Sequence, residues 1–175
     1  MRLPRPIALA GFMGAGKTTV GRLLATALER DFVDTDSEVE AATGLTIAEL
    51  FVGGREPEFR RREAEAVAGA LARGPVVLAL GGGSLGDAGS RRLLAERAIV
   101  VHLHVPWARL RPRIPALVET RPLLRGRSLA AVHRLYLARL PDYRSADITV
   151  DVRAGSAAAA AEQVLDSLRR LGHDT

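Results

Sequence analysis

Short runs of apolar residues alternate along this chain with longer stretches in which apolar positions recur every three or four residues. The runs at 7–10, 32–34, 76–80, 99–105 and 147–152 have the length of strands. The run at 76–80 is apolar at every position, as expected when both faces of a parallel strand are covered. Five such segments predict a central parallel sheet.

The stretches between the predicted strands carry helix signals. Predicted helices cover 18–30, 37–43, 46–51, 58–72, 88–96, 129–140 and 156–171. In the third of them, Glu49 follows Thr46 at the spacing of a capping box. Because strands alternate with helices, we predict a three-layer α/β/α fold around a five-stranded parallel sheet. No repeat or linker divides the chain, so residues 1–175 are expected to form one domain.

Residues 106–127 depart from this alternation because they are rich in proline and arginine. Only the first turns of the segment are expected to be helical. The part from about 114 to 127 is predicted to be a mobile loop that acts as a lid. In parallel sheets, ligands bind at the carboxyl ends of the strands. The glycine-rich stretches after the first and third strands fall at those ends, so a site is expected there.

Composition narrows the class of protein. The net charge is +5, but the basic residues are interleaved with acidic ones and only 4% of residues are aromatic, which argues against a nucleic-acid surface. The absence of cysteine excludes disulfides, thiolate metal sites and a cysteine nucleophile, and it is consistent with a cytoplasmic location. No apolar run reaches the length of a membrane span. A monomer without membrane or nucleic-acid partners is expected.

The first glycine-rich stretch, Gly11-Phe12-Met13-Gly14-Ala15-Gly16-Lys17-Thr18, matches the pattern G-x-x-x-x-G-K-[ST] in full. Its glycines let backbone amides turn toward an anion, and the helix that follows offers its N-terminus to the same place. Lys17 is the only lysine among 25 basic residues. Its compact ammonium suits the β- and γ-phosphates of a nucleotide, and the Thr18 hydroxyl suits Mg²⁺. We therefore predict a nucleoside triphosphate site.

Two carboxylates, Asp34 and Asp36, follow the second predicted strand. Residues two apart on an extended chain point the same way. One carboxylate at the mouth of a P-loop would hold a water on Mg²⁺, and the other would accept a hydroxyl proton. The alternative is a structural one, because Asp36 or Ser37 precedes a helix and would serve as its N-cap.

Two further motifs bear on the reaction. In Phe59-Arg60-Arg61-Arg62-Glu63, Arg60 and Glu63 can meet on one helical face, whereas Arg61 and Arg62 read as a solvated charge run. Gly81-Gly82-Gly83 lets a ligand approach the backbone closely. The strand at 76–80 has no acidic residue, unlike that of motor-type ATPases, and the guanine-reading Asn-Lys-x-Asp motif is absent.

Together these motifs resemble the shikimate kinase family. The resemblance covers residues 7–155 and includes the P-loop, Asp34-Thr35-Asp36, the Phe59–Glu63 motif, the glycine triplet, Arg121-Pro122-Leu123-Leu124, and Arg139 shortly before Tyr143. It implies a P-loop kinase fold that transfers the γ-phosphate of ATP to the 3-hydroxyl of shikimate, with Mg²⁺. It also implies a lid at about 114–127 and an acceptor-binding helical region at about 37–64. Arg55, Pro57 and Pro112 depart from the family pattern near helix boundaries.

The resemblance also implies a role for individual residues. Lys17, Asp36 and Arg121 would be catalytic, with Asp36 as candidate base and Arg121 closing over the phosphates. The implied nucleotide ligands are Gly14, Ala15, Gly16, Lys17, Thr18, Thr19, Arg113, Arg121 and Arg153, with Arg109 and Arg111 competing with Arg113 for the place near adenine. The implied shikimate ligands are Asp36, Arg60, Gly81, Gly82 and Arg139. Thr18 and, through water, Asp34 would bind Mg²⁺.

Other interpretations of the chain stay open. A kinase for another small polyol or cyclitol carboxylate, such as gluconate, would share most of these motifs, and so would a nucleotide-binding module without catalysis. His102 and His104 share a strand face, but no third metal ligand is evident, so ordinary packing is favoured. Met13 and Trp107 are likewise interpreted as packing residues.

Overall fold

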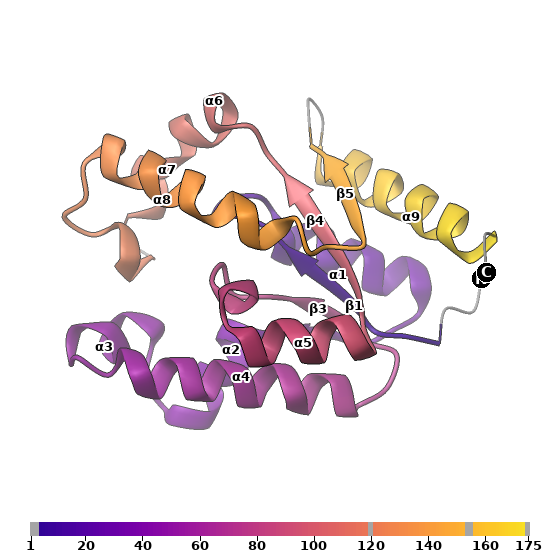
Figure 1. Cartoon of the computed structure of the whole chain (residues 1–175), viewed down its shortest axis with the longest axis horizontal. Helices are drawn as coiled ribbons and strands as arrows, with labels where there is room; N and C mark the ends of the chain where they lie inside the picture. Colours follow the sequence, from indigo (N-terminus) through magenta and orange to yellow (C-terminus); the bar gives the residue numbers. More distant parts are fainter. Residues whose placement is uncertain (1–3, 119–120, 153–155, 174–175) are drawn as a thin grey trace.

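A computed structural model describes residues 4–118, 121–152 and 156–173 of the protein. Within these ranges five strands form one sheet: β1 (Ile7–Ala10), β2 (Phe32–Asp34), β3 (Val77–Ala79), β4 (Ile99–His104) and β5 (Ile148–Asp151). They lie in the order β2-β3-β1-β4-β5, and every neighbouring pair is parallel (Figure 1). The predicted five-stranded parallel sheet is therefore confirmed.

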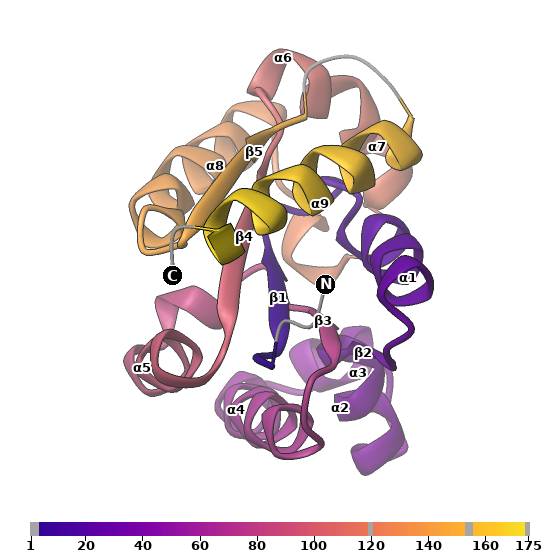
Figure 2. The ribbon, with the colours of Figure 1, turned by 90° about the vertical axis from the view of Figure 1, so that its right-hand side faces the viewer.

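Helices cover both faces of the sheet (Figure 2). On one face, α1 (Lys17–Leu28) and α9 (Ala157–His173) pack against a core that contains Leu9 and Val101. On the other face, α4 (Glu56–Ala72) and α5 (Ala88–Arg97) pack against a core that contains Ala8 and Val100. Successive residues of a strand point to opposite faces, so β1 and β4 supply both cores. The predicted three-layer fold is confirmed.

A separate small core lies beside the sheet. It consists of Val39, Leu50 and Phe59, which belong to α2 (Thr35–Thr43), α3 (Ile47–Val52) and α4. The predicted capping box opens α3, since the Thr46 side chain accepts the Glu49 amide at 3.2 Å and Glu49 accepts the Thr46 amide at 2.7 Å. This unit spans the helical region that was expected to bind an acceptor.

The segment after β4 is more helical than predicted. It contains α6 (Trp107–Leu110), the 3₁₀ turn η2 (Arg111–Arg113), α7 (Ile114–Leu117) and the 3₁₀ turn η3 (Pro122–Leu124). The prediction of a loop is therefore wrong for α7 and η3. Proline is tolerated in the first turn of a helix, where η2 and α7 carry it. Burial of Ile114 and Leu124 anchors the segment to the main core.

The helix α8 (Leu129–Tyr143) is also longer than predicted, because it continues past Pro141 for two residues. Tyr143 is 3% exposed and belongs to the core under α4 and α5, so tertiary packing holds the last turn in place. Over the described ranges, no helix combines the length and apolar character needed to cross a bilayer.

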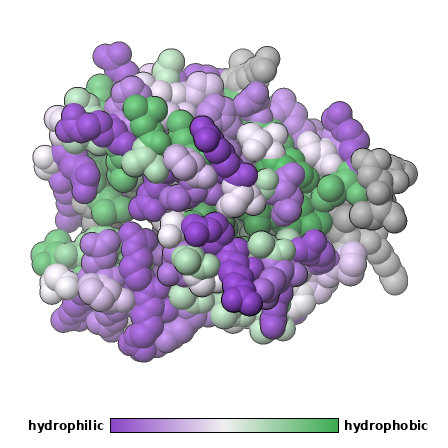
Figure 3. Space-filling view, viewed as in Figure 1, coloured by the Kyte–Doolittle hydropathy of each residue, from purple (hydrophilic) through white to green (hydrophobic). Residues whose placement is uncertain are grey.

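Hydrophilic side chains dominate the edge of the molecule over α4 (Figure 3). There, Arg61 and Arg62 pair with Glu65 at 3.3 and 3.0 Å, through partly or largely exposed side chains. The interpretation as a solvated charge run is therefore confirmed for Arg61, whereas Arg62 is half-buried and its Nε is buried without a hydrogen-bond partner among the described residues. Arg60, on the same helix, has different partners and points elsewhere.

Candidate active site

The P-loop connects β1 to α1 and is shaped by its glycines. Gly14 and Gly16 have φ values of 79° and 90°, a region that side chains disfavour, and Gly16 is the N-cap of α1. The loop forms one wall of a hollow that we call the phosphate hollow. The residues that line it are Met13, Gly14, Gly16, Lys17, Thr18, Thr19, Asp34, Asp36, Ala79, Leu80, Gly82, Leu117 and Arg121.

Lys17 begins α1 and folds back over the loop. Its Nζ donates to the carbonyls of Gly11 and Phe12 at 2.8 and 3.3 Å. Burial of the ammonium, aided by the positive charge of Arg121, lowers the pKa of Lys17 to about 8, although Asp36 and Asp34 oppose this shift. A cation held in this way is stabilised by any anion that enters the hollow.

Asp34 and Thr18 bring β2 and α1 together at the hollow. The Thr18 hydroxyl donates to Asp34 Oδ2 at 2.9 Å, and Asp34 Oδ1 accepts the amide of Asp36 at 3.1 Å. Asp34 is therefore the N-cap of α2, which begins at Thr35. The sequence suggested Asp36 or Ser37 as the N-cap of this helix, and both choices are wrong. A hydroxyl and a carboxylate side by side are oxygen donors of the kind that a small divalent cation prefers.

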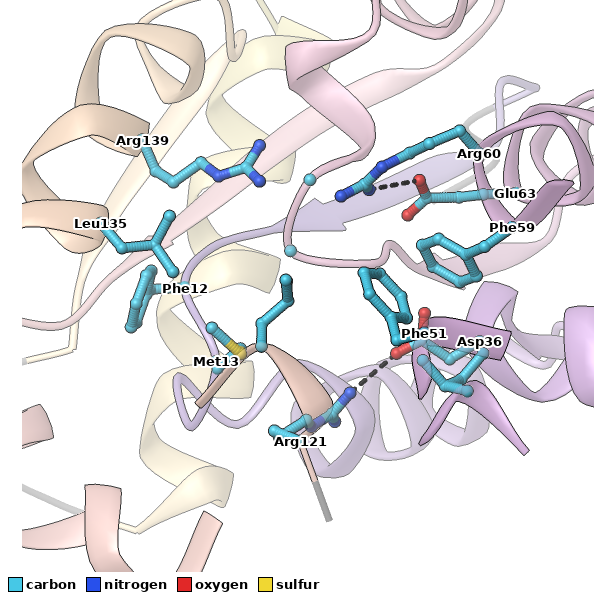
Figure 4. A pocket seen from close by; sticks show the side chains of 14 residues that line it. Phe12, Met13, Asp36, Phe51, Phe59, Arg60, Glu63, Arg121, Leu135 and Arg139 are labelled. Atoms are coloured by element: carbon cyan, nitrogen blue, oxygen red, sulfur yellow. Dashed lines mark hydrogen bonds and ion pairs between the residues drawn. The ribbon is translucent and has the colours of Figure 1, made fainter. Parts of the chain in front are cut away.

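A second hollow, which we call the arginine hollow, lies beyond Asp36 (Figure 4). Its lining combines apolar and charged residues from the P-loop, α2, α3, α4, the glycine turn 81–83, residues 121–123 and α8. They are Phe12, Met13, Asp36, Ile47, Phe51, Phe59, Arg60, Glu63, Gly82, Gly83, Arg121, Leu123, Leu135 and Arg139. The side chains of Arg60 and Arg139 enter from α4 and α8 and point toward each other across the glycine turn (Figure 4).

Acidic side chains and a glycine hold these two arginines in place. Arg60 donates to Glu63 Oε2 at 3.0 Å, and Arg139 lies 3.9 Å from Asp142. A Cβ at Gly83 would lie 2.7 Å from Arg60 Nη1 and 3.1 Å from Arg139 Nη2, so any other residue here would displace the two guanidinium groups from these positions. The predicted pairing of Arg60 with Glu63 is confirmed.

Three hydroxyls fix the glycine turn. The Gly81 amide donates to Thr35 Oγ1 at 2.9 Å, the Tyr143 hydroxyl donates to the Gly82 carbonyl at 3.1 Å, and the Ser84 hydroxyl donates to Glu63 Oε1 at 2.9 Å. The hydroxyl-bearing residues are all buried and come from α2, α8 and the 3₁₀ turn η1 (Ser84–Gly86). Side chains far apart in sequence therefore set the position of this turn.

The two hollows meet at Met13, Asp36, Gly82 and Arg121, which line both. At this junction Arg121, which directly precedes η3, donates to Asp36 Oδ2 at 2.8 Å and so joins this part of the chain to α2. A group bound in the phosphate hollow and a group bound in the arginine hollow would thus face each other beside a carboxylate and a guanidinium. Such an arrangement suits in-line transfer of a phosphoryl group.

The predicted nucleotide residues are mostly brought together. Gly14, Gly16, Lys17, Thr18, Thr19 and Arg121 line the phosphate hollow, whereas Ala15 is buried in the loop. Of the three competing arginines, Arg113 donates to the Gly14 carbonyl at 2.7 Å, Arg109 donates to the Val152 carbonyl at 3.4 Å, and Arg111 is exposed. Contact of Arg113 with adenine stays a prediction. Arg153 lies outside the described residues.

Among the predicted acceptor residues, Asp36, Arg60, Gly82 and Arg139 line the arginine hollow, and Gly81 does not. A Cβ at Gly81 would collide with Glu63 Oε1, so this glycine makes room for that carboxylate. Gly83, which sequence reasoning left out, takes part in the lining. The three glycines looked equivalent in the sequence because their difference arises from side chains of α4 and α8.

Met13 was interpreted as a packing residue, and that interpretation is incomplete, because Met13 lines both hollows. Phe51, Leu123 and Leu135 also line the arginine hollow, and no local pattern singled them out. Trp107 stacks on His133 at 4.6 Å between ring centroids, as packing predicts. His102 stacks on Tyr143 at 4.6 Å, and burial lowers the pKa of His102 to about 4.

Comparisons with known proteins agree with this geometry. A family model described as shikimate kinase matches residues 13–169. Shikimate kinase of Nitrobacter winogradskyi is 45% identical over 85% of this chain and 70% of its own length, and that of Thermobifida fusca is 44% identical over 96% and 98%. A solved structure of shikimate kinase from Acinetobacter baumannii in complex with shikimate has a TM-score of 0.89 at 38% identity, covering 95% of this chain and 94% of that one. The chain belongs to the shikimate kinase family.

Proposed function

We propose that the protein transfers the γ-phosphate of ATP to the 3-hydroxyl of shikimate and releases shikimate 3-phosphate and ADP. The observation that carries this proposal is the meeting of the phosphate hollow with the arginine hollow at Asp36. Arg60 and Arg139 face each other across the second hollow, and two guanidinium groups suit one carboxylate, which they can bind bidentately. Membership in the shikimate kinase family supports the same acceptor.

The residues of the phosphate hollow divide the work of holding the nucleotide. Lys17 binds the transferring phosphate, because its ammonium lines the phosphate hollow and can give up its bonds to the Gly11 and Phe12 carbonyls for bonds to phosphate oxygens. Thr18 would bind Mg²⁺ directly and Asp34 would bind it through a water, and the ion would supply positive charge that neutralises the phosphates. Their hard oxygen donors, 2.9 Å apart, fit this ion.

At the junction, Asp36 binds the reacting hydroxyl and accepts its proton as the oxygen forms a bond to the γ-phosphorus. The bond from the γ-phosphorus to the bridging oxygen breaks, and ADP leaves with that oxygen. Arg121 is close enough to Asp36 to reach the transferring group, where its charge stabilises the transition state. Positioning and electrostatic stabilisation thus supply most of the rate.

A coupled assay of ADP release with shikimate, ATP and Mg²⁺ tests this function. We expect turnover with shikimate and little with gluconate or other small polyols. Absence of turnover with shikimate would contradict the proposal. Faster turnover with gluconate than with shikimate would identify gluconate as the acceptor instead. In the same assay, Asp36→Asn is expected to lower kcat by about 10²- to 10⁴-fold. Asp31→Asn, at an exposed position before β2, is the control and should leave kcat unchanged.

A further inference from the structure

Glu63 is a buried carboxylate at the edge of the arginine hollow. Its residue is 3% exposed, and each of its oxygens has one donor. Oε2 accepts from Arg60 at 3.0 Å, and Oε1 accepts from Ser84 at 2.9 Å. The missing Cβ of Gly81 leaves the space that Oε1 occupies. The carboxylate is therefore held between an arginine on its own helix and a hydroxyl on another element.

Ser84 belongs to the chain that forms the floor of the same hollow. It follows the glycine turn directly, is fully buried, and donates its amide to the Gly81 carbonyl at 3.1 Å. Its hydroxyl therefore moves with the turn, whereas Glu63 and Arg60 move with α4. Of the three hydroxyls at the turn, this is the one that bonds to a side chain of the arginine hollow.

We propose that Ser84 is a positioning residue for the acceptor, because its hydroxyl fixes the Glu63 carboxylate and, through it, the direction of the Arg60 guanidinium. The inference rests on the proposed function, since Arg60 is assigned there to the acceptor carboxylate. When the Ser84 hydroxyl holds Oε1 of Glu63, the rigid carboxylate also fixes the position of Oε2, which accepts from Arg60. Because the Arg60 side chain is already ordered in one rotamer, less conformational entropy is lost when the acceptor binds.

The electrostatics of Glu63 support this assignment. Burial raises the pKa of Glu63, and the charge of Arg60 together with the hydrogen bonds from Ser84 and Arg60 opposes the rise. Loss of the Ser84 donor removes one of these opposing effects, so the pKa of Glu63 rises further. Other charged groups around the pair are Glu56 on α4, Asp36 on α2, Arg121 just before η3 and Arg139 on α8.

The sign of the pH effect follows from this. Glu63 must be ionised to hold Arg60, so acceptor affinity is lost as the pH falls through the Glu63 pKa. In Ser84→Ala that pKa is higher, and the loss begins at a higher pH. The acid limb of kcat/KM for shikimate is therefore expected to shift upward, which a hydroxyl that only fills space would not cause.

Ser84→Ala is the principal test, with Ser90→Ala as control. Ser90 is a buried serine, 5% exposed, on α5, and it lines neither hollow. We expect Ser84→Ala to raise KM for shikimate about tenfold, as for loss of a hydrogen bond to a charged group, with KM for ATP unchanged and kcat within about twofold. Ser90→Ala should leave all three values unchanged. An unchanged KM for shikimate in Ser84→Ala overturns the proposal.

A double-mutant cycle with Glu63→Ala, which removes both acceptor oxygens, separates positioning from general damage to the fold. If Ser84 acts through the Glu63 carboxylate, Ser84→Ala should change KM for shikimate less than about twofold in the Glu63→Ala background. An equal tenfold effect in both backgrounds overturns the proposal. Should Ser84→Ala melt far below the wild type, Ser84→Cys, which retains a weak donor of similar size, carries the same cycle with a smaller expected rise.

Calorimetric titration of shikimate without nucleotide distinguishes this inference from the proposed function. Shikimate binding that weakens about tenfold in Ser84→Ala supports the positioning role even if turnover is absent. Normal turnover of shikimate by wild type together with unchanged binding by Ser84→Ala leaves the function standing and removes the role of Ser84.

Discussion

The phosphate hollow and the arginine hollow lie side by side, but they are built in different ways. One wall of the first is a single stretch of chain, residues 11–18, whose shape comes from glycine dihedral angles and the start of α1. The second collects side chains from Phe12 to Arg139 and depends on hydrogen bonds between separate elements. The first is therefore sensitive to a few local residues, whereas the second is sensitive to distant residues that hold its arginines and its glycine turn.

Among the variants that separate the two hollows, the largest expected effect comes from Lys17, the single ammonium of the phosphate hollow. Lys17→Ala should lower kcat by about 10³-fold, because the positive charge on the transferring group is lost. Lys17→Arg should also lower kcat, because the planar guanidinium is bulkier than the ammonium that bonds to Gly11 and Phe12. Kinetics measure kcat, and calorimetry should show unchanged binding of shikimate. A kcat within tenfold of wild type in Lys17→Ala would remove this residue from the mechanism.

Arg139→Ala tests the hollow built from distant parts. Loss of one charged donor to the acceptor carboxylate should raise KM for shikimate about 30-fold and leave KM for ATP unchanged. Arg134→Ala, at an exposed position of the same helix, is the matched control. Equal increases in the KM for ATP and the KM for shikimate would mean that the two hollows are not separate in function.

The pH dependence of binding should differ between the hollows. Phosphates stabilise the charged form of Lys17, whose pKa is about 8 in the empty site. ATP affinity should therefore fall as the pH rises above about 8, by at most about tenfold per pH unit, and binding there should take up a proton. Calorimetry in two buffers of different ionisation enthalpy measures the uptake, and Lys17→Met should abolish it. No uptake by the wild type between pH 8 and 9 would contradict the low pKa.

The smallest expected effect concerns the floor of the arginine hollow. Tyr143→Phe removes the hydrogen bond to the Gly82 carbonyl and should raise KM for shikimate by about three- to fivefold, as for one neutral hydrogen bond. Tyr136→Phe is the control, because its hydroxyl lies on the same helix and donates to the Val105 carbonyl at 3.3 Å. If the two variants raise this KM equally, the position of the glycine turn does not depend on Tyr143.

The same contrast explains what the sequence could predict. The strands, the P-loop and the pairing of Arg60 with Glu63 follow from neighbouring residues, and all three were predicted. The lining by Met13 and Phe51 and the burial of Ser84 against Glu63 depend on packing between elements, which no local pattern encodes. Arg139 was assigned to the site only through the family resemblance. Its distance from Arg60 along the sequence does not indicate that the two side chains meet in the fold.

The predicted N-cap of α2 and the predicted loop at α7 and η3 were wrong for local reasons. Asp36 and Ser37 were the expected N-cap candidates, but Asp34, at the end of β2, caps the helix. The richness in proline and arginine suggested a loop from about residue 114, yet Pro112 and Pro115 sit in the first turns of short helices that buried Ile114 and Leu124 anchor. In this segment, burial of apolar side chains stabilises helical turns that the proline-rich composition alone does not favour.

The solitary lysine also has a consequence for how the protein can be probed. Because the chain carries one lysine, an acylated side-chain amine within the chain can only be that of Lys17. A pKa of about 8 leaves much of this amine unprotonated and nucleophilic in mildly alkaline solution. Bound nucleotide protects it, and release of nucleotide exposes it again. The rate of acylation at this one atom, followed by mass spectrometry of the proteolytic peptide that contains Lys17, is therefore a direct measure of occupancy at the phosphate hollow.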